Sequence, residues 1–310
     1  MPTTSGNYLS LGGVSGANNG AINNAQVLYP VIKTTEKYYV MAGGLVGKNS
    51  AIVNGNSTNG TITNSSVTGG SIVLDFSTNG KSAYNNKNVS IIATGSMAGG
   101  LVGYDDRTTS AYSIQNCSTT ITKVSAFFAG GFTGLSYGKL SKLSAGDTTK
   151  LYGGLEINGF HAGGFSAGIA DGFVKDSFVL CTVKACVTTG SYNDISSVVG
   201  MEISASAGYA VLISNNAEIA GNYAVVEFGG NGISFSTTAD LQGKYVGGKY
   251  TGNIFMQSGA VTAPNIGTKL TKEQITGEGG DFSEFTKNIG CTGNVHDIWN
   301  LNAGQYPTQK

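Results

Sequence analysis

Apolar residues in this chain fall in short runs rich in Val and Ile, and Asn, Gly, Ser and Thr separate the runs. Such runs are typical of β-strands, and the polar residues and glycines between them are typical of turns. Helical patterns of apolar residues are scarce. The pattern therefore predicts an all-β protein, and so many short strands call for a search for an internal repeat.

One hexapeptide recurs with small residues at its second and third positions and an apolar residue at its fourth. Its copies begin 31, 56, 31, 33 and 33 residues apart, so one interval carries an insertion, which we place at Asp75–Lys87. Stacked copies would align the fourth-position side chains in an internal ladder, while the small residues fill a corner where a Cβ would clash or φ must be positive. The copies start at Leu11, Ala42, Ala98, Ala129, Ala162 and Ile195, and their fourth positions are Val14, Leu45, Leu101, Phe132, Phe165 and Val198.

A second block follows 11 to 20 residues after a hexapeptide start and places Asn or Asp two positions after Ile or Val. This arrangement suits a strand that ends at a turn, because Asn tolerates left-handed backbone. Two fixed strands and one side of variable length predict a three-sided coil of roughly 30 residues, which is one turn of a parallel β-helix. The blocks are Ile22-Asn-Asn-Ala, Ile62-Thr-Asn-Ser, Ile114-Gln-Asn-Cys, Val174-Lys-Asp-Ser and Ile213-Ser-Asn-Asn.

These two blocks, A-G-G-L-V-G followed by I-x-N-S/C, resemble the GLUG repeat of bacterial surface proteins. That repeat also occurs in non-catalytic parts of certain IgA1-specific metallopeptidases. The segment from Asp297 to Pro307, with its W-x-x-x-x-G-x-Y-P spacing, resembles the closing segment often found after such arrays. The resemblance implies a right-handed β-solenoid with cell-surface or secreted placement, and it implies no catalytic residues.

The chain is expected to divide into a long repeat domain and a small cap. Residues 1–266 are predicted to form the β-helix, with regular repeats at 9–220, looser coils at 221–266 and about seven to nine coils in all. Residues 267–310 are predicted to form the C-terminal cap, because an uncovered last coil would present unpaired backbone groups. The N-terminal coil has much less to cover it, so it either continues in a longer chain or contacts another subunit.

The predicted cap differs from the repeats in its sequence pattern. Thr271 and Gln274 stand at the spacing of a capping box, so a helix is expected there. Phe282, Phe285 and Trp299, the one tryptophan, follow. We expect these aromatic side chains, Trp299 above all, to anchor the cap.

Composition and charge exclude several classes of function. Acidic and basic residues balance at 18 each, and Arg107 is the one arginine. Binding of nucleic acid or of an anionic membrane would need a basic patch, which the sequence lacks. No run approaches the ~20 apolar residues of a membrane-spanning helix. The first residues show no signal peptide, so we expect either a cytosolic chain or a mature or excised piece of a longer protein. The resemblance favours the second of these, with placement outside the cell or on its surface.

The sequence contains few features that indicate catalysis. The sequence has no H-E-x-x-H, G-x-S-x-G or phosphate-binding motif, so we predict no enzyme activity, no metal and no cofactor. Polysaccharide-processing β-helix enzymes need two carboxyl groups roughly 5–9.5 Å apart, and Asp171 with Glu202, expected on adjacent coils, is the best such pair. The cysteines lack zinc-site spacing and leave the disulfide connectivity open. They are Cys117, Cys181, Cys186 and Cys291.

One turn is a candidate for binding. Asp105, Asp106 and Arg107 replace the Asn-rich turn of the other copies, and Tyr104 precedes them. Tyrosine beside small polar residues forms an adaptable contact surface. We therefore expect this loop to meet a partner.

These features favour a non-enzymatic extracellular β-solenoid that acts as an adhesin or surface-display module and binds a host glycan or protein. One alternative is a structural subunit that self-associates into filaments or surface fibres. A second alternative is a polysaccharide-processing β-helix enzyme or phage tail-spike that uses Asp171 and Glu202.

Overall fold

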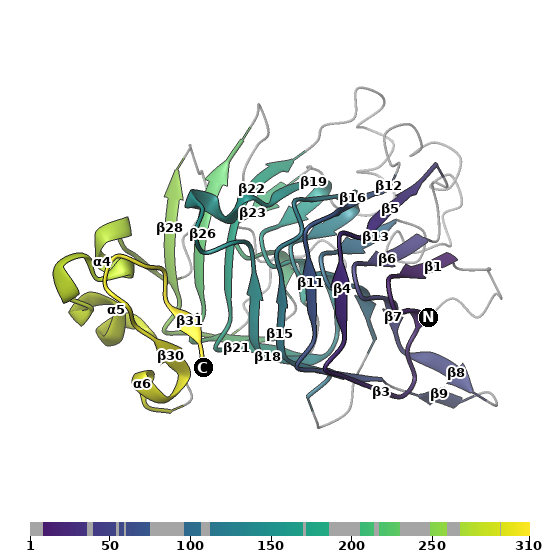
Figure 1. The fold of residues 1–310 in the computed structure, drawn as a ribbon, viewed down its shortest axis with the longest axis horizontal. Helices are drawn as coiled ribbons and strands as arrows, with labels where there is room; N and C mark the ends of the chain where they lie inside the picture. Colours follow the sequence, from purple (N-terminus) through teal and green to yellow (C-terminus); the bar gives the residue numbers. More distant parts are fainter. Residues whose placement is uncertain are drawn as a thin grey trace.

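The computed structural model is mostly β, and its strands stack along the long axis of the molecule from the N-terminal end to a small group of C-terminal helices (Figure 1). Nearly all of these strands pair in parallel with strands that lie one repeat earlier or later in the chain. Large parallel sheets are therefore the main feature of the fold. The structure describes residues 9–35, 40–53, 56–58, 60–74, 96–106, 112–169, 172–185, 205–213, 217–229, 249–258, 267–291 and 293–310.

The parallel pairings sort the strands into five rows, and a long strand can belong to two of them. Row one contains β1 (Leu9–Gly12), β6 (Val40–Gly43), β13 (Met97–Gly99), the ends of β16 (Lys123–Gly130) and β19 (Glu156–Gly163), and β23 (Ala205–Ala207). Row two contains β2 (Ser15–Ala17), β7 (Val46–Asn49), β14 (Val102–Asp105), β17 (Thr133–Ser136), β20 (Ser166–Ile169) and β24 (Ala210–Ile213).

Rows three to five follow in the same chain order. Row three contains β3 (Ala21–Asn23), β10 (Thr61–Thr63), the starts of β15 (Ile114–Thr119) and β18 (Lys139–Ala145), β21 (Phe173–Lys175), β25 (Glu218–Ala220) and β27 (Lys249–Thr251). Row four contains β4 (Gln26–Leu28), β11 (Ser66–Thr68), the ends of β15 and β18, the starts of β22 (Phe178–Ala185) and β26 (Tyr223–Phe228), β28 (Ile254–Ser258) and β29 (Thr268–Lys269). Row five contains β5 (Val31–Thr34), β12 (Ser71–Leu74), the starts of β16 and β19, and the ends of β22 and β26.

The register confirms the first five hexapeptides and corrects the sixth. Gly43 pairs with Gly12 on one side and Gly99 on the other, and the same column continues to later copies. Its sixth member is Ala207, which pairs with Gly163, so the sixth copy starts at Ser206 and not at Ile195. Val198, the predicted fourth position of that copy, lies outside the described residues. The structure puts Tyr209 in that place, because Ser166 pairs with Ala210.

The hexapeptide glycines are required by close packing and not by backbone conformation. A Cβ on Gly43 would lie 2.1 Å from the carbonyl oxygen of Val46 and 2.5 Å from that of Leu101. Its φ is not positive, so of the two reasons expected for small residues here, only the steric one applies.

The left-handed turns follow the second block. Asn24, Asn64, Asn116 and Asp176 have φ between 50° and 56°, which confirms the prediction at four of its five copies. The fifth is wrong: Ile213 lies in β24, where it pairs with Ile169. The sequence search also missed members of this column, because they carry no Asn. They are Lys142, Gly221 and Gly252.

The core runs between the rows as ladders of identical or similar side chains. Phe132 stacks on Phe165 at 5.3 Å between ring centroids, and Phe165 stacks on Tyr209 at 4.8 Å. The fourth-position side chains Leu45, Leu101, Phe132 and Phe165 are fully buried. Val14 breaks the expectation at 49% exposure, because it belongs to the first repeat and no described strand lies beyond it.

The cap packs on the last strands. The predicted capping box is confirmed, since the Thr271 hydroxyl accepts from the Gln274 N–H and the Gln274 side chain accepts from the Thr271 N–H. Trp299 and Phe285 share a buried cluster with Tyr223 of β26, with Trp299 5.4 Å from the Tyr223 ring. The cap elements are α4 (Lys272–Thr276), η2 (Glu278–Gly280), α5 (Ser283–Asn288), α6 (Val295–Ile298), β30 (Trp299–Asn300) and β31 (Thr308–Gln309).

The connections between rows differ greatly in length from repeat to repeat. Rows five and one are joined without a break inside β16 and inside β19, whereas residues 75–96 and 186–204 separate the same rows elsewhere. The predicted insertion Asp75–Lys87 falls in the first of these connections, outside the described residues. Among the described residues of that repeat, extra length forms an antiparallel hairpin, β8 (Ala51–Val53) with β9 (Asn56–Thr58). A short helix, η1 (Leu151–Gly154), joins β18 to β19.

Candidate functional site

A polar column runs through the interior where the strands of row two end. The Asn18 Nδ2 donates to Asn49 Oδ1 at 2.9 Å, and the Asn49 Nδ2 donates to Asp105 Oδ1 at 2.9 Å. Each residue comes from a different repeat, so the hydrogen bonds run along the stack. The column binds three repeats to one another.

Asp105 is the centre of this column and is completely buried. Its Oδ2 accepts from the hydroxyl of Ser113 at 2.7 Å and from that of Ser136 at 3.0 Å. A Cβ on Gly138 would lie 1.9 Å from the same oxygen, so glycine makes room for the carboxylate. A buried carboxylate with several donors is stabilised where it lies.

The expectation that Tyr104, Asp105 and Asp106 form an exposed binding loop is wrong. All three are buried, with exposed fractions of 8%, 0% and 7%. The Tyr104 hydroxyl donates to Asp106 Oδ1 at 3.1 Å, and the Lys48 ammonium lies 3.9 Å from Asp106 Oδ2. The fourth predicted member, Arg107, lies outside the described residues.

Burial shifts the pKa values of Asp106 and Tyr104. It raises the pKa of Asp106, and Lys48 and the hydroxyl of Tyr104 partly oppose that shift. Burial also raises the pKa of Tyr104 well above its ordinary value, with the nearby Asp106 carboxylate adding to the effect. The side chains of Tyr104, Asp106 and Lys48 therefore interact with one another inside the fold. Row two brings them together, because Tyr104 of β14 pairs with Lys48 of β7.

The remaining candidates give no assembled site. Asp171 and Glu202 both lie outside the described residues, so the structure does not test the enzymatic pair. Within the part of the chain that is described, no three His, Cys, Asp or Glu side chains come close enough to share a metal ion. Cys117 and Cys181 are buried and Cys291 is half-buried, and none of these three is in a disulfide. Cys186 lies outside the described residues. None of the described helices has the length and hydropathy needed to cross a membrane.

A buried histidine was missed by sequence reasoning. His161 is 2% exposed and stacks on Phe128 at 5.4 Å between centroids. Neither ring nitrogen has a hydrogen-bond partner among the described residues, and burial lowers the pKa of this imidazole to about 3. Its position just before a hexapeptide was the available signal, since the same column holds Phe128 and Met97.

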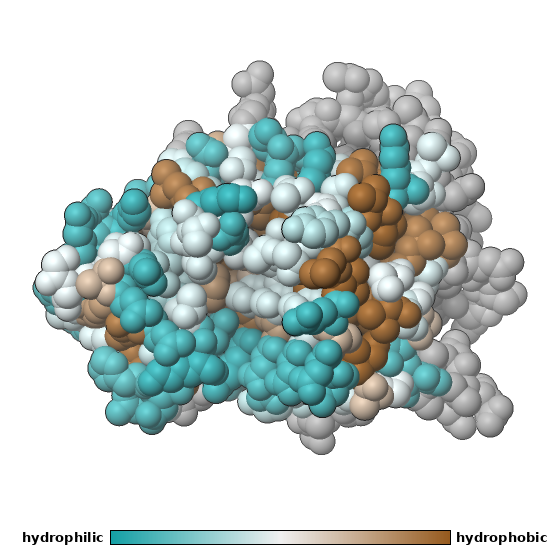
Figure 2. Space-filling view, viewed as in Figure 1, coloured by the Kyte–Doolittle hydropathy of each residue, from teal (hydrophilic) through white to brown (hydrophobic). Residues whose placement is uncertain are grey.

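The N-terminal end of the stack is apolar and uncovered by described residues. Five of the seven large apolar side chains exposed in the described part of the chain belong to the first repeat. Figure 2 shows apolar surface gathered over this end, near β4 and β5. The five are Leu9 (40% exposed), Val14 (49%), Leu28 (64%), Tyr29 (70%) and Val31 (76%), and together they form what we term the N-terminal face.

Comparisons with protein-family models, with curated proteins and with solved structures find no match to this chain.

Proposed function

We propose that the chain forms a three-sided, right-handed parallel β-helix, as the GLUG-like repeats suggest, and that it serves as a non-enzymatic display module at the cell surface or outside the cell. The observation that carries the proposal is the contrast between fixed register and variable connections. The glycine column keeps its pairing from Gly12 to Gly163. Over the same stretch the connections between rows five and one range from none, inside β16, to residues 75–96.

In such a fold the connections between strands can vary while the paired rows stay the same, and we expect a partner to bind at these connections. Backbone pairing and stacked side chains hold each repeat to its neighbours, so stability is distributed along the stack. Connections at the surface can vary in length at little thermodynamic cost. A rigid scaffold that carries variable segments is the arrangement used by many binding proteins.

The proposal is tested by binding of the purified chain to arrays of host glycans and host surface proteins. We expect saturable binding to a restricted class of spots. Replacement of residues 76–95 by a short Gly-Ser linker should leave the thermal midpoint within a few degrees, because the paired rows are unchanged. An absence of binding on both arrays, or unfolding of the linker variant, would argue against a display module.

Self-association is a second candidate, and the N-terminal face favours it. Strands β1 to β5 have unpaired edges on this side among the described residues, and an exposed strand edge readily pairs with another chain. The cap lies against the opposite end of the stack (Figure 1). Two copies would therefore join through their N-terminal faces about a two-fold axis, and growth would end at a dimer instead of continuing into a filament.

Sedimentation velocity across a concentration series tests this candidate. The wild-type chain should dimerise, and Val31→Lys should hold it as a monomer because a buried ammonium would oppose the contact. Leu151→Lys is the matched control, since Leu151 is 54% exposed but lies in η1. A monomer at all concentrations excludes the dimer, and open-ended filaments would show that the cap does not stop growth.

A further inference from the structure

The cap contains a hollow of about 610 Å³ that none of the features above explains. Its walls come from separate parts of the cap: Ser283 and Thr286 of α5, His296 of α6, and the stretch from Trp299 to Ala303. We term this hollow the cap groove. Its residues are all described, and it lies at the end of the molecule away from the N-terminal face.

The chemistry of the groove is polar but carries no acid. Its polar side chains are hydroxyls, amides, one imidazole and the ammonium of Lys310, and no Asp or Glu lines it. The side chains of His296 and Asn302 make no hydrogen bond to any described residue, and both are exposed. These two groups keep their full capacity to donate and accept.

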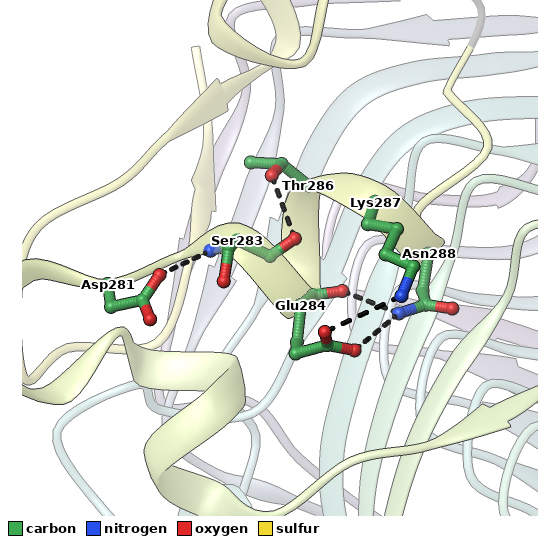
Figure 3. A network of polar contacts seen from close by, with 6 residues as sticks. All are labelled: Asp281, Ser283, Glu284, Thr286, Lys287 and Asn288. Carbon is green, nitrogen blue, oxygen red and sulfur yellow. Dashed lines mark hydrogen bonds and ion pairs between the residues drawn. The ribbon is translucent and has the colours of Figure 1, made fainter.

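Two carboxylates at the start of α5, Asp281 and Glu284, have partners in α5, as Figure 3 shows. Asp281 accepts from the backbone N–H of Ser283 at 2.9 Å. Glu284 lies 3.6 Å from the ammonium of Lys287 and also accepts from Asn288. The charge of Glu284 is therefore paired within the helix, and neither carboxylate is part of the groove lining.

Aromatic side chains complete the groove. Phe282 lines it and is half-buried, and Trp299, whose side chain is 1% exposed, is also part of the lining. The buried Nε1–H of Trp299 has no hydrogen-bond partner among the described residues.

We propose that the cap groove binds a saccharide. Sugar hydroxyls donate and accept at the same atom, as do the Ser and Thr hydroxyls that line the groove, and the Asn amides of the lining offer a donor and an acceptor side by side. The C–H face of a pyranose ring fits the half-buried Phe282. A phosphate or a nucleic acid fits less well, because Lys310 is the one fixed positive charge in the lining. The inference rests on the proposed display function and gives that function a ligand class and a place.

Trp299 makes the proposal directly testable, because it is the one tryptophan of the chain and lines the groove. The purified full chain is titrated with N-acetylglucosamine, galactose, glucuronate and short oligomers of each, and tryptophan fluorescence is recorded. We expect a saturable change with at least one of them, which calorimetry reproduces. Asn302→Ala and His296→Ala should each weaken binding by ~3- to 10-fold, the loss expected for one hydrogen bond.

A matched control separates the groove from the rest of the surface. Asn23→Ala removes an exposed amide in the first repeat and should bind as the wild-type chain does. Circular dichroism verifies that each variant is folded. No response to any saccharide by either method overturns the proposal, as does a response to short neutral peptides alone. Glycan-array binding that the groove variants leave unchanged would refute the groove as the site while the display function stands.

Discussion

At the scale of single residues, Asp105 shows how a charged group can hold repeats together. Its two oxygens accept hydrogen bonds from Asn49 of β7, from Ser136 of β17 and from Ser113, which directly precedes β15. The carboxylate is fully buried, so water cannot replace any of these bonds. It is a structural centre and not a contact point for a partner.

Asp105→Ala should lower the free energy of unfolding by about 2–4 kcal/mol, because it leaves buried donors without an acceptor. Asn23→Ala is the control, since Asn23 also bonds across repeats, to Thr63 and Asn64, but is exposed. It should cost about 0.5 kcal/mol or less. Urea unfolding followed by circular dichroism measures both. Equal losses in the two variants would show that burial is not the source of the effect.

His161 predicts a dependence on pH. Burial lowers its pKa from 6.5 to about 3. Between these values the unfolded chain binds a proton that the folded chain does not, so the stabilising effect of the neutral imidazole is present above pH 6.5 and is lost as the pH falls toward 3. The free energy of unfolding should decrease by up to about 1.4 kcal/mol per pH unit in this window.

His161→Phe should flatten that part of the profile, since phenylalanine keeps the stack on Phe128 and cannot be protonated. Urea unfolding at pH 7 and at pH 4.5 gives the two points that are needed. A variant that loses as much stability on acidification as the wild-type chain would assign the acid sensitivity to other groups.

At the scale of elements, the corner between rows one and two depends on close backbone approach. A Cβ at Gly43 would meet carbonyl oxygens of its own repeat and of the next one at 2.1 and 2.5 Å. Backbone atoms cannot move aside as a flexible side chain can, so a Cβ at Gly43, between two neighbouring repeats, separates two strands. Ala207 occupies the same column only at its last described member, where no further described strand pairs with it. This explains why the hexapeptide keeps small residues while its last positions vary.

Gly43→Ala should therefore destabilise the chain by several kcal/mol, on the order of the largest single-residue effects. Gly20→Ala is the control, because a Cβ there meets nothing within 4 Å and the φ of Gly20 is not positive. The control should be neutral or slightly stabilising. Thermal unfolding of both variants decides the matter, and a Gly43→Ala midpoint near that of wild type would show that the corner can relax.

At the scale of the whole molecule, the stack and the cap share one buried cluster but differ in architecture. Phe285 of the cap is fully buried and lies 5.8 Å from the ring of Tyr223 in β26. Each repeat contacts only its neighbours, so a weakened terminal unit can open before the rest.

Phe285→Ala should cost about 3–5 kcal/mol, with the loss concentrated in the cap. Tryptophan fluorescence reports the cap through Trp299, and circular dichroism reports the strands. In urea the fluorescence midpoint should fall below the circular dichroism midpoint, whereas Leu151→Ala, at an exposed position of η1, should leave both in place. A common shift of both signals would mean that stack and cap unfold as one unit.

The sequence by itself determined the local structure: parallel strands in repeats, the glycine corner at Gly43, the left-handed turn at Asn64 and the capping box at Thr271. Each of these depends on residues adjacent in the chain or on a steric rule that one residue type satisfies. The sequence did not locate the sixth hexapeptide, because Ser206-Ala207-Gly208-Tyr209 shares only one glycine with the motif. The structure identifies this copy, since the ring of Tyr209 stacks on that of Phe165.

Only the tertiary structure decided what the polar residues do. Two adjacent acids in a turn look exposed, yet Asp105 is buried because its donors arrive from residues 31 and 56 positions away in the chain. The cap groove likewise joins α5 to residues after β30, and the exposure of Val14 reflects its place at the end of the stack. These properties depend on which repeats become neighbours and which side of a repeat is left uncovered. A local pattern carries no information about either, because the same strand sequence is buried in mid-stack and exposed at its end.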